Sequence, residues 1–146
     1  MIELRIFTEK DCEFILNNFY PDMTPNDVYK MINDWNSLLY KNSYFEMFAV
    51  LSDNEIIGYV SLYEQGVNII GAGIKILEKH RQNGYGYTAV MSALNYATQK
   101  GYTKAVAQIS KYNTASLSLH RKLGFTVVNE EINRKGNEVF NLEKQI

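Results

Sequence analysis

A short glycine-containing loop, Arg81–Gly86, joins a predicted strand to a predicted helix. The β-rich run Val67–Leu77 precedes it, and apolar residues at helical spacing follow it from Tyr87 onward. Glycine lets the backbone approach an anion closely, and the first N–H groups of a helix have no partner within it. Together with the helix dipole, these groups favour a pyrophosphate-binding turn. A simple tight turn into a helix is the alternative interpretation.

Strand and helix patterns alternate upstream of this loop. Thr24 and Pro25 mark a helix start, with a capping hydroxyl followed by proline at the first helical position. The apolar stripe that follows includes Leu38 and Leu39, so we expect this helix to extend that far. The predicted elements before the loop are a strand over 1–7, helices that begin at Thr8 and Thr24, strands over 45–51 and 56–63 joined by the turn 52–54, and a strand over 67–77.

Downstream of the loop, Lys100 and Gly101 end a helix that begins near Tyr87. A strand over 104–109, a helix over 113–123 closed by Gly124, and strands over 125–132 and 139–142 complete the pattern. The order β-α-α-β-β-β-α-β-α-β-β predicts an α/β (α+β) fold, a mixed, mostly antiparallel central sheet flanked by helices. Because no linker, repeat or low-complexity stretch interrupts the chain, we expect residues 1–146 to form one domain.

The charge balance argues against a nucleic-acid partner, because 15 Lys and Arg residues nearly cancel 16 Asp and Glu residues. No stretch approaches the roughly 20 apolar residues of a membrane helix, and the first residues lack the basic and apolar regions of a signal peptide. The single cysteine, Cys12, lies on the apolar face of a predicted helix, where it is expected to be a buried hydrophobe. We therefore expect a cytoplasmic protein that needs no metal, nucleic acid or membrane.

The loop has features in common with two nucleotide-binding motifs. The run from Gly84 to Ala89 formally matches G-x-G-x-x-A, but the dinucleotide fingerprint also needs an acid about 20 residues later. The corresponding stretch, 104–108, has none, and the chain has no G-K-[ST] motif. The sequence therefore argues against NAD and ATP as ligands.

The loop instead resembles a motif of the GNAT N-acetyltransferase superfamily. Arg81-x-x-Gly84-x-Gly86 is similar to R/Q-x-x-G-x-G/A, placed between a strand and a helix as in that family. The family's second signature, N-x-x-[SA]-x-x-[LF]-Y-x-K-x-G-F, resembles Asn113-x-x-Ser116-x-x-Leu119-His120-x-Lys122-x-Gly124-Phe125. The predicted order of elements is also the order of the family, so the resemblance covers nearly the whole chain.

The resemblance implies acetyl-CoA as cosubstrate and a set of residues that bind it. The pantetheine arm is expected along the strand residues Ile74, Lys75 and Ile76. The CoA pyrophosphate is expected on the backbone amides of Gln82, Asn83, Gly84, Tyr85, Gly86 and Tyr87. Asn113 is placed to contact the arm and also suits a helix N-cap, while Lys122 suits either a CoA phosphate or the last turn of its helix. Gly71 and Gly73 fit the distorted strand with which the family opens its sheet, and a backbone N–H near Ile76 suits the oxyanion.

Two positions depart from the family pattern and leave the proton transfers open. His120 stands where many members carry a tyrosine that protonates the departing thiolate, so we predict that His120 is the catalytic proton donor, with a wall residue as the alternative. Gln108 stands where peptide-acetylating members often carry a glutamate base, and its neutral amide cannot accept a proton usefully. Glu64, Glu78 or water remain candidates for the base, and Tyr63 and Tyr112 are further candidate donors.

The function implied is transfer of an acetyl group from acetyl-CoA to a primary amine of a small molecule or peptide by direct attack. The alternative is a non-catalytic acyl-CoA-binding or regulatory domain of the same fold. By resemblance, the acceptor is selected by the segment Asn17–Thr24 and by the final hairpin. Phe19, Tyr20, Pro21 and Met23 suggest an apolar entrance, and Asp22 suits a cation. The oligomeric state stays open, with a homodimer as an option because dimers are common in the family.

Overall fold

An eight-stranded sheet forms the centre of the protein, which a computed structural model describes over residues 1–146. The strands are β1 (Ile2–Ile6), β2 (Leu39–Tyr40), β3 (Ser43–Ser52), β4 (Glu55–Gly66), β5 (Ile69–Ile76), β6 (Lys104–Ser110), β7 (Thr126–Ile132) and β8 (Glu138–Gln145). Their order is β1-β3-β4-β5-β6-β8-β7, with β2 beside β3. Only β5 and β6 run parallel. The predicted mixed, mostly antiparallel sheet is confirmed.

Four helices flank the sheet, together with two short 3₁₀ turns. They are α1 (Cys12–Asn18), α2 (Pro25–Asn36), α3 (Tyr85–Gln99) and α4 (Thr114–Lys122), with η1 (Glu9–Asp11) before α1 and η2 (Glu78–His80) before the glycine loop. The start of α2 is the predicted one. The Asp27 N–H donates to the Thr24 hydroxyl at 3.2 Å, and the Thr24 N–H donates to the Asp27 carboxylate at 3.2 Å.

The end of α2 differs from the prediction. The helix stops at Asn36, Leu38 has a left-handed φ of 62°, and Leu39 already belongs to β2. The expectation that the helix extends to Leu39 is therefore wrong. The chain has to reverse here to bring β2 against the start of β3, and the Phe45 N–H donates to the Leu38 carbonyl at 3.2 Å across that reversal.

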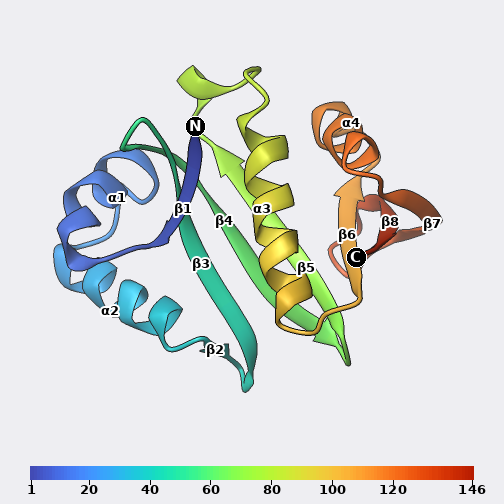
Figure 1. The fold of residues 1–146 in the computed structure, drawn as a ribbon, viewed down its shortest axis with the longest axis horizontal. Helices are drawn as coiled ribbons and strands as arrows, with labels where there is room; N and C mark the ends of the chain where they lie inside the picture. The colour runs from blue at the N-terminus through green and yellow to red at the C-terminus, as the bar shows by residue number, and fades with distance from the viewer.

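The helices cover the two faces of the sheet unequally (Figure 1). α3 and α4 pack on one face, over a core that contains Val60, Leu62 and Leu142. α1 and α2 pack on the other face, against the β3 residues Met47 and Ala49. In Figure 1 these two helices lie at the β1–β3 end, away from β6, β8 and β7.

The sheet opens between its two parallel strands. β5 and β6 pair only at Ile69–Gly71 with Lys104–Val106. Beyond these three residue pairs the β5 residues Ala72–Ile76 have no partner on the β6 side, while β6 stays paired with β8 as far as Ser110. The strands therefore separate toward their carboxyl ends, at the end of the sheet where α3 begins and α4 lies (Figure 1).

Candidate active site

The open edge of β5 contains the three residues predicted to accompany the cofactor arm. Ile74, Lys75 and Ile76 all lie beyond the last β5–β6 pair. Ile76 is buried and Ile74 is half-buried against the α3 and α4 side, whereas Lys75 is exposed and pairs with Tyr59 on β4. Backbone groups on an unpaired strand edge remain available to a ligand.

The glycine loop presents a continuous set of unpaired backbone donors. None of the six N–H groups from Gln82 to Tyr87 donates to an acceptor within the protein, and the first helical bond of α3 is Thr88 N–H to Gly84 O at 3.2 Å. Gly84 is the N-cap of α3 with a φ of 76°, and no side chain caps this helix. Gln82 also has a positive φ of 65°. The start of a 15-residue helix is therefore left to an external anion.

The side chains of Arg81 and Asn83 stabilise the conformation of this loop. The Arg81 Nε donates to the Ile76 carbonyl at 2.9 Å, which ties the loop to the end of β5. The Asn83 amide donates to the carbonyls of His80 at 3.1 Å and of Arg81 at 3.2 Å. The loop is thus organised without use of its own N–H groups.

Gly86 is not required by the packing of the protein itself. A β-carbon there would meet Leu119, Ile76 and Ile74 at 3.7–3.9 Å, which is ordinary van der Waals contact. That β-carbon would point to the place where β5 and α4 approach each other, lined by Ile74, Ile76 and Leu119 and called the gap below. Gly84, by contrast, has open space around its β-carbon position and needs glycine for its left-handed backbone.

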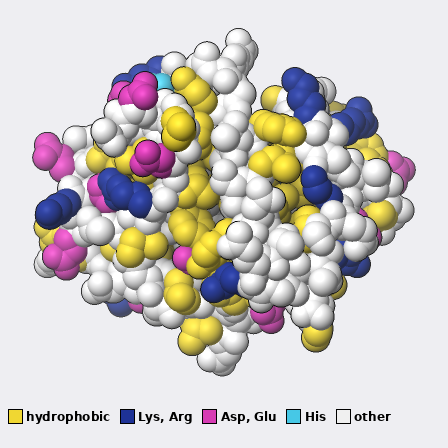
Figure 2. Space-filling model, in the orientation of Figure 1, with side chains coloured by type: hydrophobic (Ala, Val, Ile, Leu, Met, Phe, Trp, Pro, Cys, Tyr) yellow, Lys and Arg dark blue, Asp and Glu magenta, His cyan; other side chains and the backbone are white.

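α4 forms the opposite wall of the gap. Asn113 is its N-cap and accepts a hydrogen bond from the Ser116 N–H at 3.1 Å. The predicted capping role is confirmed, and a contact with the cofactor stays a prediction. Arg121 and Lys122 are exposed in the last turn. Figure 2 shows hydrophobic side chains along the furrow between α3 and α4, with Lys and Arg side chains over α4.

His120 lies on the buried side of α4. Its side chain is 5% exposed, and its ring packs edge-on against Phe125 with centroids 5.1 Å apart. Nδ1 lies 2.8 Å from the Ser116 carbonyl, an arrangement in which Nδ1 carries the proton and donates. Burial lowers the pKa of His120 below its ordinary value. The ring is therefore neutral at pH 7, with an unprotonated Nε2.

The carboxylates and tyrosines predicted as further candidates are dispersed. Glu64 accepts a hydrogen bond from the Tyr102 hydroxyl at 2.7 Å, and Glu78 is exposed in η2. The exposed Tyr112 hydroxyl is bound to the Glu138 carboxylate. Tyr63 lines a cavity.

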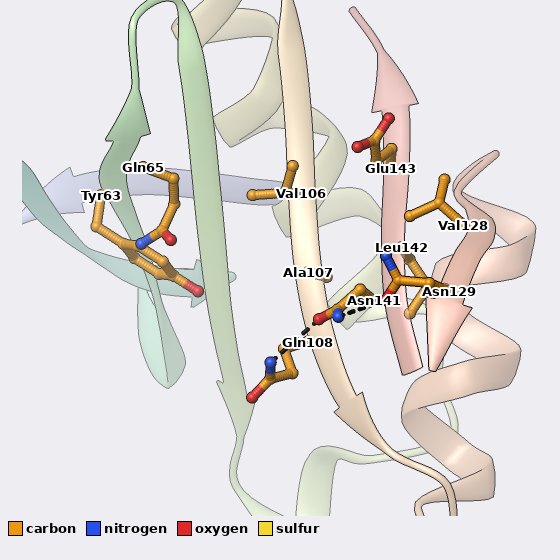
Figure 3. Close-up of a pocket in the computed structure, with 10 residues that line it drawn as sticks. All are labelled: Tyr63, Gln65, Val106, Ala107, Gln108, Val128, Asn129, Asn141, Leu142 and Glu143. Carbon is orange, nitrogen blue, oxygen red and sulfur yellow. Dashed lines mark hydrogen bonds between the residues drawn. The ribbon is translucent and has the colours of Figure 1, made fainter. Parts of the chain in front are cut away.

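That cavity lies on the sheet face opposite α3 and α4, and its volume is about 440 Å³ (Figure 3). It spans the separation of the sheet, because its wall includes residues of β4 on one side and of β6, β7 and β8 on the other. The lining residues are Tyr63, Gln65, Val106, Ala107, Gln108, Val128, Asn129, Asn141, Leu142 and Glu143. Side chains alternate between faces along a strand, so Gln108 faces this cavity while Ile109 faces the α3 and α4 core.

The amide of Gln108 is fully engaged within this wall. Its nitrogen donates to Glu131 and to Asn141, both at 3.1 Å, and its oxygen accepts from Asn133 at 3.3 Å. The Asn141 amide in turn donates to Asn129 at 2.7 Å. Sequence reasoning missed Asn129, Glu131, Asn141 and Glu143, because their proximity to Gln108 depends on the register of β6, β8 and β7.

The segment between the first two helices is partly buried. The Phe19 ring packs edge-on against Tyr59 with centroids 5.1 Å apart, and Tyr20 and Met23 pack on the core beneath α1 and α2. Pro21 and Asp22 are exposed. A role of this segment in choosing the acceptor stays a prediction.

Neither a metal cluster nor a membrane-spanning helix is found. No three His, Cys, Asp or Glu side chains are grouped so that they could hold a metal ion. Every helix is too short or too polar to cross a membrane.

Comparison with known proteins identifies a family model and several relatives. Residues 2–126 match the model of the acetyltransferase (GNAT) domain. A Bacillus subtilis (strain 168) protein, the SPbeta prophage-derived uncharacterized N-acetyltransferase YokL, is 26% identical over 126 residues, which cover 84% of this chain and 70% of that protein.

Solved structures share the fold over almost the whole chain. Spermidine N-acetyltransferase from Vibrio cholerae, in complex with CoA and spermine, has a TM-score of 0.78 at 21% identity and covers 99% of this chain and 95% of its own. A putative acetyltransferase, yncA, from Salmonella typhimurium with its cofactor acetyl-CoA has a TM-score of 0.75 at 17% identity, with 99% and 94% covered.

Proposed function

Since the chain belongs to the GNAT acetyltransferase family, we propose that it transfers the acetyl group of acetyl-CoA to a primary amine of a small molecule or peptide. The observation that carries this proposal is the run of six unpaired N–H groups from Gln82 to Tyr87 at the start of α3. A pyrophosphate supplies the acceptors and the negative charge that such a helix start favours.

The open edge of β5 suits the rest of the cosubstrate. The pantetheine arm of CoA carries two amide groups, which can pair with backbone groups that have no β6 partner along Ala72–Lys75, as an added strand would. Ile74, Ile76 and Leu119 border the gap and provide apolar contact for the arm. The thioester then lies where β5 and β6 separate.

The acceptor amine is proposed to occupy the cavity on the opposite face. Its nitrogen attacks the thioester carbon, the C–S bond breaks, and the thiolate takes up a proton. An alkyl amine with a pKa of about 10.4 is protonated at neutral pH, so it must first lose a proton. Glu143, which is paired with Lys104 at 3.4 Å, lines this cavity, and Glu131 accepts a hydrogen bond from Gln108, so we propose these two carboxylates as candidates to receive that proton. Small amine substrates are also what the name of the Vibrio cholerae relative describes.

A specific observation supports a second candidate function, a non-catalytic acyl-CoA-binding domain. The neutral, buried His120 is poorly suited to donate a proton, and Gln108 has no free amide atom. A binding domain would show acetyl-CoA affinity without acetyl transfer to any amine of a broad panel.

Gly86→Ala tests the cosubstrate site. The added methyl group fits the protein without a clash but enters the gap where the arm is placed. Alanine also favours a helix over glycine by about 1 kcal/mol. We expect equal or higher stability in urea unfolding together with at least tenfold weaker acetyl-CoA binding in calorimetry.

Gly66→Ala, at the turn between β4 and β5, is the matched control. Its methyl group would meet only the Ile69 side chain, whose flexible Cδ1 atom is nearest at 3.3 Å, and acetyl-CoA affinity should stay within twofold of the parent. A Gly86→Ala protein that is folded and binds acetyl-CoA like the parent would contradict the assignment of the gap.

A further inference from the structure

Tyr63 occupies the point at which the sheet opens. It pairs across β4 and β5 with Gly71, and Gly71 pairs with Val106 in the last residue pair of β5 and β6. The three residues therefore lie side by side on three neighbouring strands. Just beyond them, β5 has a free edge.

Glycine at position 71 is explained by the Tyr63 ring. A β-carbon at Gly71 would lie 2.2, 2.6 and 2.8 Å from three atoms of that ring, distances that real structures do not show. At Gly73 a β-carbon would lie 2.9 Å from the Ser61 hydroxyl and 4.0 Å from the Tyr63 ring. Neither glycine has a positive φ. The bare backbone of β5 thus forms a seat on which the ring lies.

The ring lines the cavity, and its hydroxyl is free. Tyr63 faces Gln108 and Asn141 across the cavity, and Figure 3 shows it on the opposite side of the opening from β6 and β8. No protein group hydrogen-bonds its hydroxyl, in contrast to Tyr102 and Tyr112. Burial raises the pKa of Tyr63, so the hydroxyl remains a neutral donor and acceptor throughout the neutral pH range.

We propose that Tyr63 is a specificity-determining residue, whose ring on the seat of Gly71 and Gly73 narrows the acceptor cavity to unbranched, polar aliphatic amines. The ring takes up the room that a bulky or aromatic acceptor would need beside the sheet opening, and the free hydroxyl offers a hydrogen bond to a polar group of the acceptor. The amides of Gln108, Asn129 and Asn141 make the facing wall polar as well. This inference rests on the proposed function, which places the amine in this cavity.

The test compares the binding of two amines by ligand-observed NMR in the presence of CoA. Spermidine is the unbranched probe, and phenethylamine is the probe whose ring matches the volume that Tyr63→Ala vacates. The parent protein should bind spermidine more tightly than phenethylamine. Tyr63→Ala should shift the ratio of the two dissociation constants by tenfold or more toward phenethylamine, while the affinity for acetyl-CoA stays within twofold. An unchanged ratio overturns the proposal, as does a parent protein that binds neither amine.

Gly71→Ala tests the seat in two backgrounds. Its methyl group displaces the ring, so spermidine binding should weaken at least tenfold when Tyr63 is present and less than twofold in the Tyr63→Ala background. Equal weakening in both backgrounds would mean that Gly71 serves the sheet alone, which overturns the proposal. Gly66→Ala is again the control that should leave binding unchanged. Tyr63→Leu replaces Tyr63→Ala if the latter does not fold.

Binding keeps this test separate from the proposed reaction. If the amines bind as expected but neither they nor a wider panel is acetylated, the proposed transfer fails and the role of Tyr63 stands. If an amine is acetylated but its selection does not depend on Tyr63, the transfer stands and this inference fails.

Discussion

Burial is the main influence on the pKa of His120, and it outweighs the opposing effect of the hydrogen bond to the Ser116 carbonyl. Nδ1 donates to the Ser116 carbonyl at 2.8 Å, the ring packs edge-on against Phe125, and the residue is buried. Protonation would place a charge in that enclosed site. The folded-state pKa is therefore below the ordinary value of about 6.5, and the unfolded chain takes up the proton more readily.

The lowered pKa of His120 in the folded state predicts how the free energy of unfolding depends on pH. Well above the unfolded pKa of about 6.5, the residue is neutral in both states and contributes no pH dependence. As the pH falls below that value toward the lowered folded pKa, protonation of the unfolded chain should reduce the free energy of unfolding. His120→Asn retains an N–H donor for the Ser116 carbonyl but does not titrate, so its urea-unfolding midpoint should fall less between about pH 7 and 5. Parallel curves for the two proteins would show that His120 does not titrate differently on folding.

The turn between β2 and β3 depends on the backbone conformation of its two central residues. β2 and β3 are joined by the two residues Lys41 and Asn42, both with positive φ, of 50° and 66°. This is the backbone of a type I′ turn, for which Asn-Gly is the preferred sequence. Lysine is ill suited to the first position, because its β-carbon is crowded in the left-handed region.

Lys41→Gly should therefore stabilise the protein by about 1 kcal/mol, because the left-handed strain of roughly 1–2 kcal/mol is removed and part of it is offset by chain entropy. Lys30→Gly is the matched control. It removes an exposed lysine from the interior of α2 and should destabilise by about 1 kcal/mol. Urea unfolding of both variants provides the measurement. Changes of the same sign would contradict the explanation by backbone conformation.

Short sequence motifs predicted those helix ends whose structure is determined by neighbouring residues. The caps at Thr24 and Asn113 and the glycine loop before α3 needed only neighbouring residues to be recognised. β2 could not be predicted in this way, because the apolar Leu38 and Leu39 continue the helical spacing while their conformation is set by pairing with β3. The residues of the cavity wall could not be predicted from the sequence for the same reason. Asn141 reaches Gln108 through a register between distant strands, which no short motif encodes.

At the scale of the whole molecule, the sheet is two subsheets joined by a weak seam. Strands β1–β5 and strands β6–β8 share the three residue pairs at Ile69–Gly71, supplemented by hydrogen bonds from the Thr103 and Lys104 N–H groups to the Asn68 carbonyl and by the packing of α3 and α4 on one face. The proposed site of the pantetheine arm, along Ala72–Ile76, lies where the two halves separate. We therefore expect bound acetyl-CoA to stabilise the pairing of the two halves as well as the glycine loop.

Hydrogen exchange can measure this coupling. At 100 times its dissociation constant, a ligand that binds only the folded state adds about 2.7 kcal/mol of stability. We expect acetyl-CoA to slow amide exchange most strongly at 72–76 and 82–87, and also along β6 near Ala107–Ile109. Exchange in β1, which is remote from the seam in the strand order, should respond only to the global increase. Protection limited to the loop 82–87 would contradict binding along the seam.

The sparse seam also has a consequence for the order in which the chain leaves the ribosome. β5 is complete well before β6 and β8 have been synthesised, so the nascent chain carries a long, apolar and wholly unpaired strand edge from Ile69 to Ile76. Such an edge is a template for pairing with another chain. Only Lys75 places a charge on this segment, and charge on an edge strand discourages aggregation. We therefore expect Lys75 to oppose such pairing while the last three strands are still being synthesised.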